Sequence, residues 1–297
     1  MKVRIGFGLG AAASVGAAGR FGELVDGLEA LRFDSLWLSE RLTGDAPDPL
    51  IGLAVAAGRT TRLKLGTSVL VVPGRNPVVL AKELASLDVL SGGRLLPAVG
   101  LGAVRPAEQA AFGVERGERA AWLEEALPLL RELWTGEPVT HEGPRFRLDG
   151  VQIGPRPIGT MDVWFGGQAR SELRRTGRLG DGWLPSFCTP ADVAEGWEVI
   201  TETAAEHDRT IDPEHLGALV VFANSEVPEG VAALIAQRRP ELEPGDIVPI
   251  GLDGLRAQLE KFIAAGASKF VLVPADEPPE WEPALRDLTD AVFDLQT

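Results

Sequence analysis

Small and polar residues interrupt one of the most apolar stretches of this chain, and they are its first candidates for chemistry. The stretch Leu63–Val72 reads LKLGTSVLVV, and its aliphatic and β-branched residues favour a parallel strand that is buried on both faces. Gly66, Thr67 and Ser68 conflict with such packing, and local conflicts of this kind often mark a functional site. The alternative is that the two hydroxyl groups only satisfy backbone groups beside a bulge.

The positions where the apolar stretches end carry many small residues and few ionisable ones. They are Phe7, Gly8, Ser39, Glu40, Arg41, Thr67, Ser68, Val69, Gly100, Leu101, Gly102, Gly166, Gly167, Gln168, Asp181, Gly182, Trp183, Asn224 and Pro274. Glycine lets a flat ligand lie close to the main chain. Gly166-Gly167-Gln168 precedes a predicted helix, whose first N–H groups and dipole suit an anion. The inventory indicates a planar ligand that carries a phosphate, although any one of these glycines could be a simple turn former.

The sequence gives less support for a metal site or for a serine or cysteine nucleophile. The histidines, His141, His207 and His215, lack the H-x-H or H-E-x-x-H spacing of metal ligands, so no metal site is expected. Ser68 has no G-x-S-x-G elbow and no histidine at another strand end to act as its base. Cys188 is expected to be a small packed side chain rather than a nucleophile.

Two charged residues, Glu40 and Arg41, stand together at the end of another predicted strand. Glu40 is the candidate for proton transfer, and the alternative is that the two side chains form an ion pair at the rim. A phosphate-site aldolase or isomerase would need a lysine at a strand end. Lys269 instead starts a strand, at the opposite rim.

Strand and helix patterns alternate about eight times along the chain. Strands are expected at 3–9, 33–38, 63–72, 94–99, 162–165, 182–187, 216–223 and 269–273, and helices at 21–31, 49–58, 78–90, 118–134, 169–177, 191–207, 230–239, 252–265 and 282–295. This order predicts a parallel sheet with right-handed crossovers, and eight units fit an α/β fold of the closed (β/α)8 TIM barrel type. Residues 1–297 are expected to form a single domain, with a hairpin excursion around 139–153.

An open doubly wound sheet is the competing architecture. The segment Gly8–Ala13 matches a loose G-x-G-x-x-A dinucleotide pattern, but Ser14, Gly16 and Gly19 separate it from the next helix. The barrel is therefore the preferred prediction.

Composition narrows the class of protein. The 297 residues are 45% hydrophobic and carry a formal net charge of −14, without a basic patch for nucleic acid or an anionic membrane. A single cysteine excludes an internal disulfide framework and fits a reducing compartment. No signal-peptide pattern and no membrane-spanning segment is recognised, so a soluble cytoplasmic protein is expected.

Several blocks of the sequence resemble the bacterial luciferase-like family, and especially its branch of coenzyme F-420-dependent oxidoreductases. The blocks are FDSLWLSER, LKLGTSVLVVPGRNPVVLAKELASLDVLSGGRL, AVGLGAVRPAEQAAFGVERGERAAWLEEALPLLRELWTGEPV, HEGPRFRLDGVQIGPRP, VWFGGQA and TGRLGDGWLPS. Together they cover nearly the whole chain, and the central blocks are the most specific.

The resemblance implies a (β/α)8 barrel that binds coenzyme F-420, or alternatively FMN, at the carboxyl ends of its strands. It places a non-prolyl cis peptide at Ser68–Val69, in a bulge that supports the ring. It also implies that residues 166–169 lie near the phosphate and that Gly182 and Trp183 flank the ring or its side chain. The cofactor-binding residues are expected to be Phe7, Glu40, Thr67, Ser68, Val69, Gly100, Gly102, Gly166, Gly167, Gln168, Ala169, Gly182 and Trp183.

The chain also departs from this branch. Its sugar-phosphate dehydrogenases have Asp-His after the second strand, where this chain has Glu40-Arg41, and a glutamate where this chain has Ala103. Oxidation of a sugar phosphate is therefore not expected.

The leading hypothesis is an oxidoreductase that exchanges hydride between F-420 and a small organic substrate, with Glu40 handling a proton. The alternatives are an FMN-dependent monooxygenase, a non-catalytic cofactor-binding barrel and, last, the phosphate-site enzyme. A homodimer is expected because the family commonly dimerises through barrel helices. Arg20, Arg75 and Arg105 could steer a polyanionic tail, or could be solvated surface charges.

Overall fold

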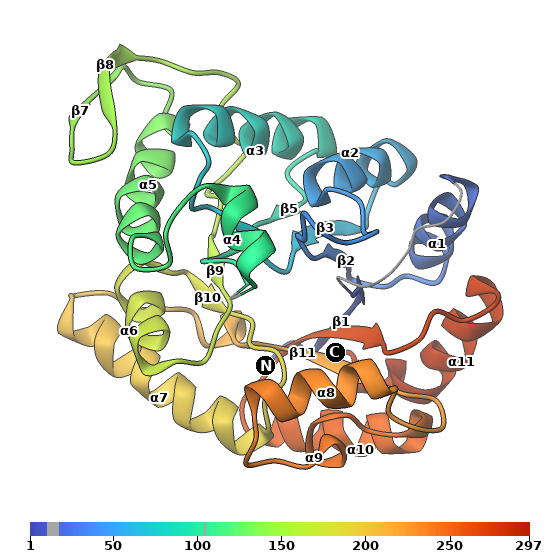
Figure 1. Ribbon diagram of the computed structural model, residues 1–297. Coiled ribbons are helices and arrows are strands. Elements are labelled where there is room, and N and C mark those ends of the chain that lie inside the picture. The colour runs from blue at the N-terminus through green and yellow to red at the C-terminus, as the bar shows by residue number, and fades with distance from the viewer. Residues whose placement is uncertain (11–17, 104) are drawn as a thin grey trace.

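The computed structural model describes residues 1–10, 18–103 and 105–297, in which helices surround a ring of strands (Figure 1). The strands are β1 (Arg4–Leu9), β2 (Ser35–Leu38), β3 (Lys64–Thr67), β4 (Leu70–Val71), β5 (Leu95–Leu96), β6 (Ala98–Gly100), β7 (Val139–Glu142), β8 (Arg147–Val151), β9 (Trp164–Phe165), β10 (Gly182–Trp183), β11 (Gly217–Phe222) and β12 (Lys269–Pro274). The helices are α1 (Ala18–Ala30), α2 (Pro49–Arg59), α3 (Pro77–Ser91), α4 (Pro106–Phe112), α5 (Arg119–Trp134), α6 (Arg170–Leu179), α7 (Pro190–Glu206), α8 (Glu229–Arg238), α9 (Pro244–Ile247), α10 (Gly251–Ala264) and α11 (Trp281–Val292). Short 3-10 turns lie at Pro213–His215 and Phe293–Leu295.

The ring of strands is a closed barrel. Parallel pairings follow the order β11-β12-β1-β2-β3-β5 in one run and β10-β9-β6-β4 in another. On one side the runs are joined because β3/β4 and β5/β6 are successive pieces of two barrel strands. On the other side, parallel bridges join Trp183 to Leu216 and Ser186 to Leu219. The predicted (β/α)8 TIM barrel is confirmed and the open doubly wound sheet is wrong. Positions 11–13 of the dinucleotide pattern lie outside the described residues.

Two expected strands, 63–72 and 94–99, are each broken in the middle. Ser68 and Val69 separate β3 from β4, and Pro97, which has no N–H to donate, separates β5 from β6. The buried hydroxyl of Thr67 spans this irregularity, because it donates to the carbonyl of Ala98 at 2.7 Å and accepts its N–H at 3.0 Å. The side chain of Thr67 therefore replaces part of the strand ladder.

Two tryptophans fill the barrel interior. Trp37 and Trp164 belong to one buried cluster with inward-facing side chains of the other strands. A Cβ on Gly66 would clash with the ring of Trp37, and a Cβ on Gly182 would clash with the ring of Trp164. Glycines paired with these tryptophans on the adjacent strands thus make room for the large side chains, so the interior is a packed core rather than a pore.

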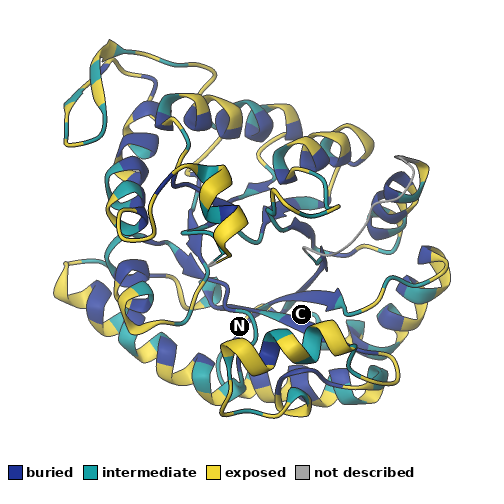
Figure 2. Cartoon of the chain, in the orientation of Figure 1, coloured by how far each residue is buried: buried dark blue, intermediate teal, exposed yellow. Residues whose placement is uncertain are grey.

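The helices pack their apolar faces against the outside of the barrel, as the burial pattern in Figure 2 shows. Two helices next to the strand ends have well-defined starts. Asp48 accepts the N–H of Leu50 at 2.9 Å at the start of α2, and Asn76 accepts the N–H of Val78 at 2.9 Å at the start of α3. Each of these helices begins with a proline, which is favourable in the first turn.

The expected hairpin excursion is confirmed, because β7 and β8 pair antiparallel and project beyond α5 in Figure 1. Two short helices, α4 and α9, were not expected, since seven and four residues are too few to produce a clear helical period. Strand six is also shorter than expected, with only Gly182–Trp183 paired as β10. Among the described helices, none has the length and apolarity needed to cross a membrane.

Candidate functional site

The side chain of Val69 lies in the barrel mouth between glycines of two neighbouring strands. A Cβ on Gly100 would come within 2.7 Å of Val69 Cγ2, and a Cβ on Gly166 within 2.9 Å of Val69 Cγ1. Cβ atoms in real proteins essentially never show such close contacts, so glycine is required at both positions while Val69 keeps its place. The main chain at Gly100 and Gly166 stays partly exposed, which is the surface that a flat ligand can approach.

The Ser68–Val69 peptide bond is cis, as the resemblance implied. This bulge is fastened to the end of β2. Ser39 Oγ donates to the carbonyl of Ser68 at 2.8 Å, the N–H of Ser68 donates to the carbonyl of Leu38 at 2.9 Å, and the N–H of Glu40 donates to the carbonyl of Val69 at 3.2 Å. The backbone around Val69 is therefore held in position by its neighbouring strand.

Glu40 continues this attachment with its side chain, which is only 1% exposed. Its Oε2 accepts the N–H of Val71 at 2.6 Å, and its Oε1 accepts a hydrogen bond from Arg75 Nη2. Burial raises the pKa of Glu40, while the positive charge of Arg75 opposes that rise. Both carboxylate oxygens are engaged, so Glu40 joins β2 to the chain that leaves β4.

The partner of Glu40 is thus Arg75, which corrects two expectations: the ion pair at the rim is not formed between neighbours in sequence, and Arg75 is not a solvated surface charge. The Arg75 side chain is 23% exposed, and its Nε donates to the carbonyl of Val71 at 3.0 Å. Trp122 Nε1 donates to the carbonyl of Arg75 at 3.3 Å, which also ties this segment to α5.

The loop after β6 is organised by a buried arginine. Arg119, 3% exposed, donates from Nη1 to the carbonyls of Leu101 at 3.0 Å and Ala103 at 3.3 Å, and from Nε to the carbonyl of Val114 at 3.1 Å. Gly102, with φ +83°, passes between these carbonyls. The arginine therefore fixes the loop that follows the strand-end glycine Gly100.

The expected phosphate site at the start of α6 contains a carboxylate. Gly167 has φ +89°, and a Cβ there would clash with the side chain of Glu172 in the first turn of the helix. Burial raises the pKa of Glu172, whereas Arg175 and a hydrogen bond from the backbone of Ala169 lower it. An anion bound at this helix end would meet Glu172, and the protonated form would repel it less.

Gln168 is tied into the loop after β10 rather than pointing freely to solvent. Its Nε2 donates to the carbonyl of Ser186. Its Oε1 accepts from Arg239 Nη1 at 3.2 Å, and the same Nη1 donates to the carbonyl of Phe187 and to Asp192, each at 3.0 Å. Arg239 therefore links the ends of β9 and β10 to the start of α7.

Two further arginines, Arg105 and Arg238, bring positive charge to the mouth, and sequence analysis missed Arg238. Arg238, at the end of α8, lies over the ring of Phe187 at 5.3 Å from its centroid. Arg238 is exposed to solvent, but nearby protein still desolvates its guanidinium group. This desolvation lowers the pKa of Arg238, and the positive charge of Arg105 lowers it further. The two cations repel each other, as groups in an anion-binding site do. The only hint of Arg238 in the sequence is that it adjoins Arg239 at the end of a predicted helix.

Two predicted cofactor-binding side chains point away from the mouth. Phe7 faces outward and packs edge-on against Trp281, with ring centroids 5.8 Å apart. Trp183 is 1% exposed, packs against Gly196 of α7 and donates from Nε1 to the carbonyl of Gly167 at 2.8 Å. A direct contact of either ring with a ligand in the mouth is inconsistent with this placement.

Asp181 and Gly182 lie at the start of strand six, not at its end as expected. The strand begins at Gly182, and Asp181 before it accepts from Arg131 at 2.6 Å and from Arg209 at 3.1 Å. This ion-pair cluster belongs to the amino-terminal rim of the barrel, which in barrels of this type serves stability.

Cys188 and Lys269 lie where the sequence predicted, one packed in the protein and the other at the start of a strand. Cys188 is 3% exposed, and burial raises the pKa of its thiol to about 12. Lys269 begins β12 at the amino-terminal rim, where its ammonium lies 5.2 Å from the centroid of the Trp164 ring and burial lowers its pKa. Among the residues that the structure describes, no group of three or more His, Cys, Asp or Glu side chains could hold a metal ion.

A family model described as luciferase-like monooxygenase matches residues 3–290. The chain belongs to the luciferase-like monooxygenase family, which confirms the resemblance.

A curated relative with 32% identity over 224 residues is the F420-dependent glucose-6-phosphate dehydrogenase of Kineococcus radiotolerans, and the match covers 69% of this chain and 66% of that protein. The matched segments of four such dehydrogenases cover 55% to 66% of their own length, which is less than two thirds.

Solved structures show the same fold. An F420-dependent secondary alcohol dehydrogenase in complex with an F420-acetone adduct has a TM-score of 0.83, with 19% identity and full coverage of both chains. The oxygenating constituent of 3,6-diketocamphane monooxygenase from Pseudomonas putida, in complex with FMN, has a TM-score of 0.79, with 16% identity, and covers 100% of this chain and 99% of that chain.

Proposed function

We propose that this protein is an oxidoreductase that uses coenzyme F-420 and exchanges hydride with a small organic substrate. The observation that carries the proposal is the bulge at Val69, flanked by Gly100 and Gly166, at the mouth of a luciferase-like barrel. A side chain at either glycine would force Val69 or the main chain to move, and would so disturb the surface on which a flat ring can rest. The relatives named F420-dependent dehydrogenases support this choice of cofactor.

The residues present fit such a cofactor. Ser68, Val69, Gly100 and Gly166 would support the ring, and the main chain of residues 167–169 would face the phosphate. A bound deazaflavin supplies hydride chemistry, whereas reduced FMN also reacts with oxygen. The side chains of Thr67 and Glu40 would act indirectly, because their hydrogen bonds hold the bulge in place. Gly102 would shape the adjoining loop.

The charge at the mouth favours F-420 over FMN. Arg105 and Arg238 add positive charge to a chain with a formal net charge of −14. A polyanionic tail would relieve the repulsion between the two guanidinium groups, and FMN carries only one phosphate for this purpose. FMN-dependent oxygenation stays the second candidate, because an FMN complex is among the structural neighbours.

Glu40 is also proposed to handle a proton during hydride exchange. Its raised pKa suits that task, while its two hydrogen bonds and 1% exposure favour a positioning role. Ala103 offers no carboxylate to help, so a sugar phosphate is not the proposed substrate.

Anaerobic titration with F-420 and with FMN, followed by absorbance and fluorescence, tests the proposal. We expect binding of F-420 and its reduction or oxidation in the presence of an alcohol, carbonyl or alkene substrate panel. Preference for FMN with oxygen consumption would support the monooxygenase instead. Tight F-420 binding without turnover on the panel would favour a non-catalytic cofactor-binding barrel, and binding of neither cofactor would contradict all three functions.

We further propose a cytoplasmic homodimer. Three apolar side chains on two adjacent helices support the dimer: Ile51 and Val55 on α2, and Val79 on α3, are 67%, 49% and 54% exposed. Burial of such a patch is a common reason for association. Light scattering should give twice the monomer mass, and Ile51→Glu with Val79→Glu should shift it to the monomer value. The lone buried Cys188 is compatible with a reducing compartment.

A further inference from the structure

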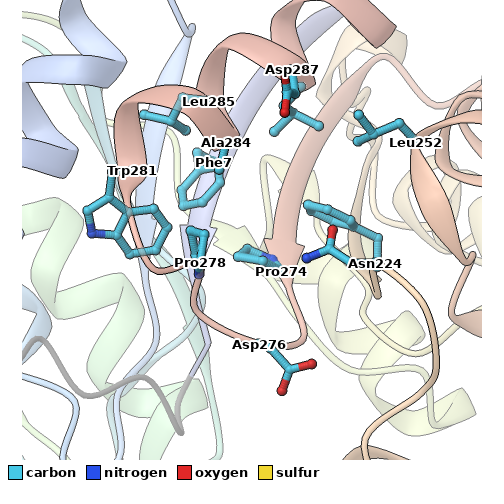
Figure 3. Close-up of a pocket in the computed structure, with 12 residues that line it drawn as sticks. Phe7, Asn224, Leu252, Pro274, Asp276, Pro278, Trp281, Ala284, Leu285 and Asp287 are labelled. Carbon is cyan, nitrogen blue, oxygen red and sulfur yellow. The ribbon is translucent and has the colours of Figure 1, made fainter.

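A cavity of about 250 Å³ lies against the outer faces of β1, β11 and β12. Its walls come from β1, β11 and β12 on one side and from α10 and α11 on the other (Figure 3). Gly8 faces the barrel interior, where a Cβ would lie 2.8 Å from Val271 and Val273. Because neighbouring residues of a strand face opposite sides, Phe7 points outward into this cavity, which is therefore separate from the candidate cofactor site.

The walls are mostly aromatic and aliphatic. Phe7 and Trp281 approach each other edge-on, and Phe222, Leu285 and Leu288 complete an apolar surface. An engineered apolar cavity of about 150 Å³ binds benzene. A cavity of about 250 Å³ is thus large enough for an aromatic or alicyclic ring with a short substituent.

The charged side chains that line this cavity are Asp276 and Asp287, and both are acidic. Asp287 and Asp276 lie at opposite ends of the lining side chains, and in this view Asn224 lies between them in height (Figure 3). No lysine, arginine or histidine is among the lining residues that the structure describes. Charge complementarity therefore selects a cationic rather than an anionic group.

Trp281 already holds a cation on its ring. The guanidinium of Arg20 lies 5.2 Å from the ring centroid, and its charge is balanced by Glu277 at 3.5 Å. The sequence suggested a steering group for a cofactor or a solvated surface charge at Arg20. The structure instead stacks Arg20 on Trp281, a residue of the cavity wall.

We propose that this cavity is a second ligand site, which takes a small apolar ring bearing an ammonium group. The ring packs between Phe7, Trp281 and Leu285, and the ammonium group is directed to Asp276 or Asp287. The site is independent of the proposed cofactor and remains testable whichever cofactor the mouth binds.

Ligand-observed NMR and calorimetry with 2-phenylethylammonium test the site, with 3-phenylpropanoate as the anionic probe of similar size. We expect saturation transfer and heat with the ammonium probe, and binding weaker by about tenfold or more for the carboxylate. F-420 should not displace the ammonium probe. Equal binding of both probes, no binding of the ammonium probe at millimolar concentration, or its displacement by F-420 would overturn the proposal.

Two sets of variants, each with a control outside the cavity, locate the binding. Ala284→Leu extends three carbons from the cavity wall on α11 and should weaken the ammonium probe by about tenfold or more, whereas Ala257→Leu on the exposed face of α10 should not. Asp276→Asn with Asp287→Asn should abolish the preference for the cation, whereas Asp290→Asn, outside the cavity on α11, should keep it. Unchanged binding in both Ala284→Leu and the double variant would overturn the site, and circular dichroism confirms that each variant is folded.

Discussion

The side chain of Val69 leaves no room for a side chain at Gly100, because a Cβ there would lie 2.7 Å from Val69 Cγ2. Gly166 meets the same side chain from the next strand, at 2.9 Å. The valine of one strand and the glycines of two others therefore form one surface, and that surface is the floor of the proposed ring site.

The first prediction concerns this floor. Gly100→Ala should weaken F-420 binding by about tenfold or more, because either Val69 or the main chain must shift. Val69→Ala in the same chain should restore part of the affinity by removing the clash. Gly58→Ala, in α2 where a Cβ meets no atom within 4 Å, is the control and should leave binding unchanged. Equal affinity of the wild type and Gly100→Ala would contradict this account of the floor.

The second prediction concerns the side chain that holds the bulge. Glu40→Gln should lose the charged hydrogen bond with Arg75 and lower the free energy of unfolding by about 1–3 kcal/mol, measured by urea denaturation. Because burial raises the pKa of Glu40, protonation of its carboxyl group adds a pH-linked component to the stability. This component is complete below the ordinary value of 4.5 and is lost as pH rises through the folded-state value. The variant should lack this component of the pH dependence.

Kinetics separate the two roles of Glu40. A pure positioning residue would change cofactor affinity in Glu40→Gln and leave the pH dependence of kcat unchanged. A proton-transfer residue would lower kcat and remove one limb of the pH profile. An unchanged rate would remove Glu40 from proton transfer.

The third prediction concerns Glu172 at the start of α6. Its carboxyl group, with a raised pKa, lies against Gly167 where the cofactor phosphate is expected. F-420 affinity should therefore be highest when Glu172 is protonated and should fall as pH rises above 4.5 through its folded-state pKa. Glu172→Gln should flatten that profile in a fluorescence titration, while a slope identical to that of the wild type would exclude Glu172 as its cause.

The fourth prediction concerns the arginines at the mouth. Arg238→Gln should weaken F-420 more than FMN, and the affinity that remains should depend less on salt, because one cation that attracts the tail is lost. Arg147→Gln, on the exposed hairpin strand β8, makes the same change in net charge and serves as the control. A similar loss in both variants would show a general effect of charge rather than a site.

The fifth prediction concerns the burial of Cys188 and does not depend on the cofactor. Its thiol is 3% exposed with a pKa of about 12, so native protein should react with iodoacetamide at pH 8 far more slowly than unfolded protein. Mass spectrometry of the alkylated chain measures the difference. Rapid labelling under native conditions would contradict the packed environment of this cysteine.

The sequence was sufficient for the barrel because each strand is an apolar stretch closed by glycine or a polar residue, and helices alternate with strands at regular intervals. The hairpin also followed from composition, since glycine and proline interrupt the helical pattern there. The cis bulge at Ser68–Val69 was predicted only through the family resemblance, because no local propensity encodes it.

Side-chain direction and distant pairing were beyond the sequence. The outward orientation of Phe7 and Trp183 depends on which face each short strand turns to the interior, and a shift by one residue reverses it. The partnership of Glu40 with Arg75 joins residues 35 positions apart, with α2, β3 and β4 between them in the chain. Arg238 reaches the mouth only because α8 ends beside the loop that carries Phe187.

The most direct test of the central claim is the affinity of F-420, measured anaerobically for the wild type, Gly58→Ala and Gly100→Ala. The account predicts that the first two proteins bind F-420 equally and that Gly100→Ala binds it about tenfold or more weakly while remaining folded. Failure of the wild type to bind F-420, or equal binding by all three proteins, would contradict a flat cofactor resting against the strand-end main chain.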